Sequence, residues 1–256
     1  MQNLVIAYIQ TKQFWQDKKA NYSHFEKKLM TIDGAPDLVL LPEMFNTSFC
    51  MEPSLAEEVT GESISWMIKK AAEGNYLLGA TLMIRDGLDV YNRFVIVNGS
   101  GIQASYNKMH LFSHAGEKEE FASGKQNQIF ELKNWKILLK VCYDLRFPLD
   151  SRNNEKAPYD LAIYLANWPA KRSYAWRTLL QARAIENQAY VIGVNRIGID
   201  GNEHAYDGSS GAFDPWGNKI HSSDNRDEIY MTTLRYSELE KIRESFNTLK
   251  DEIDDY

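Results

Sequence analysis

The chain has 256 residues, of which 44% are hydrophobic, and it carries a formal net charge of −6 with a sequence pI near 5.5. This length and composition are enough for a substantial core, and without an apparent linker we expect one domain over residues 1–256. The Lys and Arg residues are scattered along the chain, which excludes a phosphate-tracking surface, so we expect no nucleic-acid partner.

The N-terminal segment and the cysteines indicate the compartment. MQNLVIAYIQ lacks the basic region of a signal peptide and reads as a first strand. No apolar run approaches the roughly 20 residues of a membrane span. Nothing in the sequence pairs Cys50 with Cys142, so a disulfide is not expected and a reducing compartment is. We therefore expect a cytoplasmic protein without a membrane partner.

Apolar runs and amphipathic spacing predict an α/β protein. Strands are predicted near residues 4–10, 37–42, 76–83, 90–98, 102–107, 136–141, 160–165, 189–196 and 228–233. Helices are predicted over 17–32, 62–74 and 173–187, the last with Ser173 as its N-cap. The alternation predicts a mixed sheet with helices on its outer side. The acidic end DEIDDY is predicted to be a solvated tail.

An acid, an amine and a thiol each end a strongly apolar run. Glu43 follows DLVLLP, Lys108 follows GIQASYN, and Cys142 follows WKILLKV. Because ligands bind where the carboxyl ends of strands meet, these residues predict one reaction centre with covalent catalysis by cysteine. A buried cysteine is usually an apolar filler, and we keep that interpretation for Cys50. Cys142 precedes the polar turn YDLRFP and is placed to project into a cleft.

The thiol needs a base or a cation, because the thiolate is the nucleophile. Glu43 lies in an apolar neighbourhood that would raise its pKa towards that of a general base. Lys108 is suited to face the oxyanion that forms when the thiolate attacks a carbonyl. Taken singly, Glu43 is equally well explained as a solvated loop carboxylate, and a lone lysine such as Lys108 is far more often a surface residue. Their combination with Cys142 is what predicts the chemistry.

Several motifs in this order resemble the nitrilase, or carbon-nitrogen hydrolase, superfamily. They are LLPEMF around Glu43, YNKMHLF at 106–112, VCYDLRFP at 141–148, the block at 164–198 and YDGSSGAFDPWGN at 206–218. The resemblance implies an αββα sandwich, a four-layer fold of two mixed sheets, commonly assembled as a homodimer or larger homo-oligomer. It implies that Glu43 is the general base, Lys108 the cation at the tetrahedral intermediate and Cys142 the nucleophile, with the Tyr143 N–H completing the oxyanion hole. No metal or organic cofactor is implied.

The family also uses a second glutamate after the lysine motif. HAGEKEEFASG offers Glu117, Glu119 and Glu120. The spacing to Gly124 resembles the family best with Glu117, and we expect that residue to belong to the site.

The run NWPAKR at 167–172, with CYDLRFP and ARAIENQAYV, resembles the omega-amidase branch. Such enzymes remove the terminal amide from small 2-oxo acid amides such as 2-oxoglutaramate and 2-oxosuccinamate. Their substrates carry a carboxylate, which needs a cationic or N–H anchor. The candidate anchors are Arg146, Lys171 and Arg172. Alternatively, Arg146 pairs with Asp144, and the other two face solvent.

Aromatic residues near the motifs are candidates for the pocket wall. Trp168, Phe45 and Tyr143 would line a site for a short carbon chain, although aromatic residues beside strands are more often core. Arg183 and Glu186, three apart on one predicted helix, are expected to form a supporting ion pair.

Competing interpretations remain open at this point. His110 and His114 have a spacing that suits zinc on a helix, but the glutamate of a zinc protease and a third ligand are missing. A Cys-His hydrolase would leave Glu43 and Lys108 unexplained. An aliphatic amidase, an N-carbamoyl amino acid hydrolase or a nitrilase would use the same three residues. A non-catalytic binding or assembly module is the alternative of another class, and intact Glu43, Lys108 and Cys142 argue against it.

Overall fold

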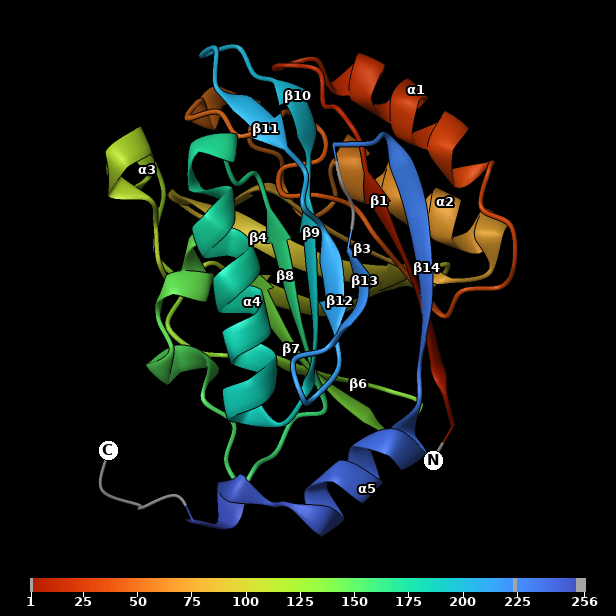
Figure 1. Ribbon diagram of the computed structural model, residues 1–256. Helices are drawn as coiled ribbons and strands as arrows, with labels where there is room; N and C mark the ends of the chain where they lie inside the picture. Colours follow the sequence, from red (N-terminus) through yellow and green to blue (C-terminus); the bar gives the residue numbers. More distant parts are fainter. Residues whose placement is uncertain (1, 223–224, 252–256) are drawn as a thin grey trace.

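The computed structural model describes residues 2–222 and 225–251. Two six-stranded mixed sheets pack face to face, and helices cover their outer faces, as Figure 1 shows. The four-layer αββα sandwich implied by the resemblance is confirmed. A separate two-stranded sheet, β10-β11, lies beside the larger two.

The first sheet has the order β14-β1-β2-β3-β4-β5. Its strands are β1 (Leu4–Gln10), β2 (Leu38–Leu40), β3 (Leu77–Asp86), β4 (Asp89–Asn98), β5 (Gly101–Asn107) and β14 (Glu228–Leu234). The second sheet has the order β13-β12-β9-β8-β7-β6. Its strands are β6 (Ile129–Leu132), β7 (Trp135–Val141), β8 (Leu161–Ala166), β9 (Tyr190–Asn195), β12 (Gly211–Phe213) and β13 (Lys219–Ser222).

The smaller sheet and the helices complete the fold. The smaller sheet pairs β10 (Ile197–Ile199) with β11 (Ala205–Asp207). The α-helices are α1 (Lys18–Leu29), α2 (Glu62–Gly74), α3 (Glu117–Glu120), α4 (Ser173–Asn187) and α5 (Tyr236–Ser245).

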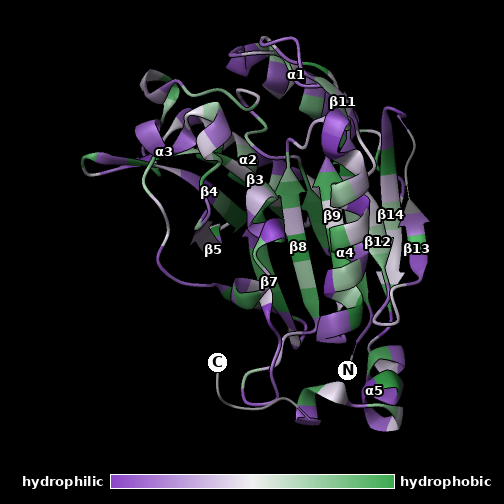
Figure 2. Cartoon of the chain, turned by 60° about the vertical axis from the view of Figure 1, so that its left-hand side comes forward, coloured by the Kyte–Doolittle hydropathy of each residue, from purple (hydrophilic) through white to green (hydrophobic). Residues whose placement is uncertain are grey.

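Successive side chains of a strand point to opposite faces of its sheet, so each sheet has one face towards the other sheet and one towards the helices. In β1, Leu4, Ile6 and Tyr8 enter the core between the sheets, whereas Ala7 and Ile9 face the core under α1 and α2. In the second sheet every residue of β8 and β9 is buried, because α4 covers the outer face. These central strands carry hydrophobic colours along most of their length in Figure 2.

The predicted elements correspond to observed ones with ends that differ by up to three residues. The bounds of α4 agree with the prediction, but its N-cap does not. Arg172 occupies the cap position, and Ser173 is the first helical residue. The Ser173 hydroxyl bonds to Asp207 instead, so its prediction as N-cap is wrong. Seven elements were not predicted from the sequence because they are short or strongly polar: β6, β10–β13, α3 and α5. Of DEIDDY, only Asp251 lies within the described residues.

The strand directions bring the predicted reactive residues to one edge. β1, β2 and β3 run parallel, and β5 has the same direction because β4 is antiparallel to both of its neighbours. In the second sheet β7, β8 and β9 are parallel. Glu43 follows β2, Lys108 follows β5 and Cys142 follows β7, so all three stand at carboxyl ends of strands.

Over residues 2–222 and 225–251, no helix combines the length and the hydropathy that a membrane span needs.

Candidate active site

Glu43, Lys108 and Cys142 meet between the two sheets. Glu43 and Lys108 are fully buried, and Cys142 is 8% exposed. The Lys108 Nζ lies 3.0 Å from Glu43 Oε1. The Cys142 Sγ lies 3.9 Å from the Asn167 carbonyl oxygen and contacts the Glu43 carboxylate. The three residues singled out in the sequence therefore form one cluster.

Cys142 occupies a sharp transition between two elements. It begins the 3-10 helix Cys142–Arg146 directly after β7 and has φ = 43°, in the left-handed region that residues with a Cβ seldom adopt. Such backbone conformations are concentrated at functional sites. The turn takes the chain out of the sheet, and the cysteine lines a cavity instead of continuing the core. The Tyr143 N–H lies in the first turn of this helix, where amides have no partner within the helix.

Glu117 is the glutamate that joins the cluster. Its Oε1 and Oε2 lie 3.0 Å and 2.8 Å from the Lys108 Nζ, and Oε2 accepts the Phe112 N–H at 2.6 Å. The carboxylate is fully buried. Glu119 and Glu120 are exposed, so only the residue favoured by the spacing lies at the site.

Two asparagines that sequence reasoning missed complete the polar network. Asn92 in β4 donates from Nδ2 to Glu43 Oε1 at 2.8 Å and to Glu117 Oε1 at 3.1 Å. The Asn167 N–H donates to Glu43 Oε2 at 2.7 Å. A buried asparagine inside the apolar strand run VYNRFVIV was the available signal for Asn92. Asn167 had the same signal as Cys142, because it directly follows a buried strand.

Burial and neighbouring charges set the protonation of the cluster. Burial, reinforced by the Glu43 carboxylate, raises the pKa of the Cys142 thiol well above its ordinary value, although Lys108 opposes this. Burial would lower the pKa of Lys108, but Glu117 and Glu43 outweigh it and raise that pKa. Burial also raises the pKa of Glu117 against the effect of Lys108. The resting cluster thus holds a neutral thiol beside a charged ammonium.

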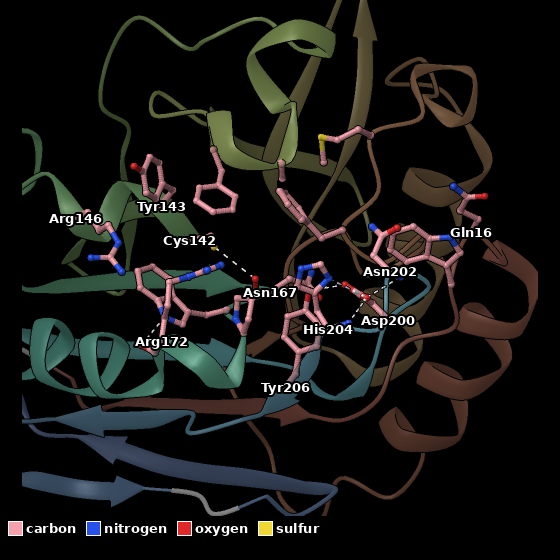
Figure 3. Close-up of a pocket in the computed structure, with 17 residues that line it drawn as sticks. Gln16, Cys142, Tyr143, Arg146, Asn167, Arg172, Asp200, Asn202, His204 and Tyr206 are labelled. Carbon is pink, nitrogen blue, oxygen red and sulfur yellow. Dashed lines mark hydrogen bonds and ion pairs between the residues drawn. The ribbon is translucent and has the colours of Figure 1, made fainter.

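Cys142 opens onto a cavity of about 290 Å³, drawn in Figure 3. Four of the predicted substrate-binding residues line it: Tyr143, Arg146, Trp168 and Arg172. The Arg146 guanidinium lies 4.9 Å from the centre of the Trp168 ring. The Arg172 guanidinium lies 5.1 Å from the centre of the Phe112 ring. Two cations held over aromatic faces give the cavity a positive wall.

The other two predicted substrate-binding residues lie elsewhere. Phe45 is buried in the core under α1 and α2, where its ring stacks on Trp66 with 5.5 Å between centroids, and it does not line the cavity. The chain turns after Glu43, and Phe45 points to the outer face of the first sheet. Lys171 is exposed and does not line the cavity either.

Of the two ion pairs suggested by the sequence, one is present and the other is not. Arg183 and Glu186 form the expected pair on α4, with 2.7 Å between Nη1 and Oε1. The alternative pair of Arg146 with Asp144 is wrong, because Asp144 accepts from Val141 and His110 while Arg146 lies over Trp168.

The histidines do not form a zinc site. His110 lies between Asp144 and Asp150, and its ring stacks on Phe147 with 3.8 Å between centroids. His114 is exposed in the short 3-10 helix Ser113–Ala115. Across residues 2–222 and 225–251, no group of three or more His, Cys, Asp or Glu residues is arranged to hold a metal ion.

The far wall of the cavity comes from the β10–β11 hairpin, which the sequence analysis missed. Asp200, Asn202, His204 and Tyr206 line it. Asp200 fixes the hairpin: its Oδ2 accepts the Tyr206 hydroxyl at 2.8 Å and its Oδ1 accepts the His204 N–H at 3.0 Å. The cavity therefore has a cationic side and a hydrogen-bonded hairpin side, with Cys142 between the two sheets.

Comparison with known proteins gives the class to which this fold and site belong. The carbon-nitrogen hydrolase family profile matches residues 5–244, and the chain belongs to that family.

Individual proteins with carbon-nitrogen hydrolase or amidase names are similar to this chain over most of its length. Over 252 residues the chain is 40% identical to omega-amidase YafV of Escherichia coli K12, covering 98% of this chain and 97% of the relative. It is 31% identical to 2-oxoglutaramate amidase of Bacillus subtilis, covering 84% of each. The crystal structure of a CN-hydrolase superfamily protein from Xanthomonas campestris, which has an arsenic adduct in its active site, matches with a TM-score of 0.96 and 34% identity. That match covers 100% of this chain and 99% of the other.

Proposed function

We propose that the protein is an omega-amidase, an amidohydrolase that releases ammonia from the terminal amide of small 2-oxo acid amides. The observation that carries this proposal is the buried Glu43–Lys108–Glu117 cluster beside Cys142, at a cavity with two arginines in its wall. The relatives named omega-amidase and 2-oxoglutaramate amidase support the choice of substrate.

In the first half-reaction Cys142 attacks the amide carbonyl carbon. Glu43 takes the thiol proton as the carbon–sulfur bond forms, because the raised pKa of the thiol means that few thiolates exist beforehand. The carbonyl oxygen becomes an oxyanion, for which the Lys108 ammonium and the Tyr143 N–H are the donors. When the intermediate collapses, the carbon–nitrogen bond breaks and Glu43 returns the proton to the departing ammonia.

The second half-reaction hydrolyses the thioester. Glu43 takes a proton from water, whose oxygen attacks the acyl carbon. The carbon–sulfur bond then breaks, and the sulfur recovers a proton from Glu43. Asn92 and Asn167 hold the two carboxylate oxygens, so the base keeps one orientation through both halves. Glu117 keeps the Lys108 ammonium charged and directed towards Glu43.

The substrate carboxylate requires a cation at a distance from the thiol. Arg172 and Arg146 line the same cavity as Cys142, and both guanidinium groups lie over aromatic rings. A guanidinium binds a carboxylate through two parallel hydrogen bonds. Trp168 links the two arginines, because its ring lies under Arg146 while its Nε1 donates to the Arg172 carbonyl at 2.8 Å. We assign the carboxylate anchor to Arg172, with Arg146 beside it.

Ammonia release from a matched substrate panel tests the proposal. The panel is 2-oxosuccinamate, 2-oxoglutaramate, a simple aliphatic amide, an N-carbamoyl amino acid and a nitrile. We expect selective turnover of the two 2-oxo acid amides. Turnover confined to another member would keep the chemistry and overturn the substrate, and no turnover of any member would overturn the enzymatic assignment.

Two substitutions separate the nucleophile from a general effect of losing a thiol. Cys142→Ala should abolish ammonia release and leave the fold intact. Cys50→Ala is the matched control, since Cys50 is also buried but does not line the cavity. Ammonia release retained by Cys142→Ala would contradict the covalent mechanism. A third variant tests the base: Glu43→Gln should slow acylation severely.

Three broader properties belong to the same proposal. We place the enzyme in the cytoplasm, in keeping with two unpaired cysteines. We expect a homodimer or larger homo-oligomer, which light scattering of the purified protein would measure. We treat residues 1–256 as one domain whose partner is a small amide and not a nucleic acid.

A further inference from the structure

Asp144 is a buried carboxylate that lies outside the cavity, and the proposed chemistry does not use it. It is fully buried in the 3-10 helix that Cys142 begins. Its Oδ2 accepts the Val141 N–H at 2.9 Å and the Tyr106 hydroxyl at 2.8 Å. Its Oδ1 accepts the His110 N–H at 2.9 Å and lies 3.0 Å from His110 Nδ1. All four contacts come from segments that carry the reactive groups.

These contacts connect the two sheets at the site. Tyr106 and His110 stand two residues before and two residues after Lys108, at the end of β5 in the first sheet. Val141 directly precedes Cys142, at the end of β7 in the second sheet. Much of the contact between the two sheets is made by apolar side chains, which constrain position less sharply than hydrogen bonds. Asn167 bonds the end of β8 to Glu43, but Asp144 is bonded to both the lysine segment and the cysteine segment. One carboxylate thus holds the lysine segment against the cysteine segment.

We propose that Asp144 is a positioning residue that sets the separation between the Lys108 ammonium and the Cys142 sulfur. The inference goes beyond the proposed substrate, because any acyl transfer at this cysteine would need the same separation. Asp144 does not touch the cavity, so its effect acts through the two segments that it joins.

The surrounding residues keep Asp144 in place and charged. His110 Nε2 lies 3.0 Å from Asp150, and the His110 ring stacks on Phe147, so the imidazole that contacts Asp144 is itself held on three sides. Burial would raise the pKa of Asp144, but His110, Lys140 and the Val141 amide outweigh it and lower that pKa. The carboxylate therefore stays an acceptor, as its four contacts require.

Asp144→Asn changes the acceptor while keeping the shape. An amide offers one acceptor oxygen and one donor NH₂, so the donors that meet one of the two original oxygens would face an NH₂ group. The lysine and cysteine segments would then separate. A displacement of about 1 Å at reacting groups costs on the order of 100-fold in rate. Because the cavity wall is untouched, we expect kcat to fall by about that factor with little change in KM.

Asp160→Asn is a matched control. Asp160 is also a buried carboxylate bonded to a backbone N–H and a cation, Lys136 N at 2.9 Å and Arg243 Nη1 at 2.8 Å. It directly precedes β8, at the end of the second sheet away from the cavity. Its substitution should lower Tm and leave kcat within about threefold. Equal losses of kcat in both variants at equal losses of Tm would overturn the proposal.

The pH dependence of thiol alkylation provides a readout that needs no substrate. The rate of alkylation by 2-chloroacetamide would be measured in the Cys50→Ala variant, so that Cys142 is the thiol that reacts. Lys108 lowers the pKa of Cys142, so moving it away should shift the alkylation midpoint to higher pH in Asp144→Asn and not in Asp160→Asn. An unchanged midpoint together with an unchanged kcat would also overturn the proposal.

A second variant covers the case in which Asp144→Asn does not fold. Tyr106→Phe removes one of the four donors and leaves the carboxylate in place. We expect a smaller displacement than in Asp144→Asn, with kcat lowered by about tenfold and the alkylation midpoint moved in the same direction, because one of the contacts between the β5 end and Asp144 is lost. A Tyr106→Phe variant with wild-type values for both would contradict the positioning role.

Discussion

Replacing Lys108 with methionine tests the electrostatics of the cluster. The Lys108 Nζ lies 3.0 Å from Glu43 Oε1 and 3.0 Å from Glu117 Oε1, so the two carboxylate oxygens are at most about 6 Å apart. With the ammonium removed, two like charges at roughly that distance repel by about 3 kcal/mol at an effective dielectric constant of about 20. Breaking buried ion pairs typically costs a similar amount, about 3–5 kcal/mol.

The loss should depend on pH in a defined direction. Burial already raises the pKa of Glu117 in the folded protein, and removing Lys108 should raise it further. A carboxyl whose folded pKa exceeds its unfolded pKa binds more protons when folded, so stability falls as pH rises through the interval between the two values. We therefore expect the stability lost in Lys108→Met, relative to wild type, to be smaller at pH 5 than at pH 8.

Thermal and urea denaturation at both pH values would measure this effect. For a protein of this size each kcal/mol shifts Tm by about 2–4 °C, so we expect a decrease of roughly 6–12 °C at pH 8. Lys108→Met/Glu117→Gln should recover most of that stability without recovering activity. Lys70→Met is the matched control, because Lys70 is also buried but pairs with the half-exposed Glu26 and Glu73. A double variant less stable than Lys108→Met would refute the reasoning.

Three further predictions concern the thiol, the anchor and the backbone. Because the Glu43 carboxylate raises the pKa of Cys142, Glu43→Gln should shift the alkylation midpoint of the thiol to lower pH even as ammonia release falls. Arg172→Gln should raise KM for 2-oxoglutaramate by about 10- to 100-fold, from about 1.5–3 kcal/mol of lost charged hydrogen bonds, and leave KM for a simple aliphatic amide unchanged. Gly124→Ala should lower both Tm and kcat, measured by melting and ammonia release, because the new Cβ would lie 2.0 Å from the Asn107 carbonyl oxygen beside Lys108.

The reactive residues were predictable because each has a local signal. A charged or nucleophilic residue just after a buried strand is improbable as packing. Lys108 and Cys142 directly follow β5 and β7, and Glu43 stands three residues after the end of β2. Parallel strand direction then brings their carboxyl ends to one edge. The long helices α2 and α4 were predictable for a similar reason, since their amphipathic spacing covers three or more turns.

Residues whose role depends on how distant segments of the chain pack together were not predictable. Asn92 lies inside β4, and only the approach of β2 and β5 turns it into a donor to two carboxylates. Phe45 illustrates the opposite error: it lies two residues from Glu43, but its side chain enters the core under α1 and α2. The polar hairpin β10–β11 has no apolar period, so no sequence pattern indicates that it forms a cavity wall.

The charge balance of the cluster explains why three ionisable groups are buried together. Glu43 must accept a proton from Cys142 and later release it, so its carboxylate has to be free to change partners during the reaction. A buried glutamate without a partner would hold its proton, and one bound to a dedicated cation would not take it. Because Lys108 is shared with Glu117, its charge is divided between two carboxylates, and Glu43 keeps only part of it. Glu117→Gln should therefore leave the whole Lys108 charge to Glu43 and slow acylation, measured as ammonia release in a single turnover. Unchanged acylation together with a lowered Tm would assign Glu117 a purely structural role.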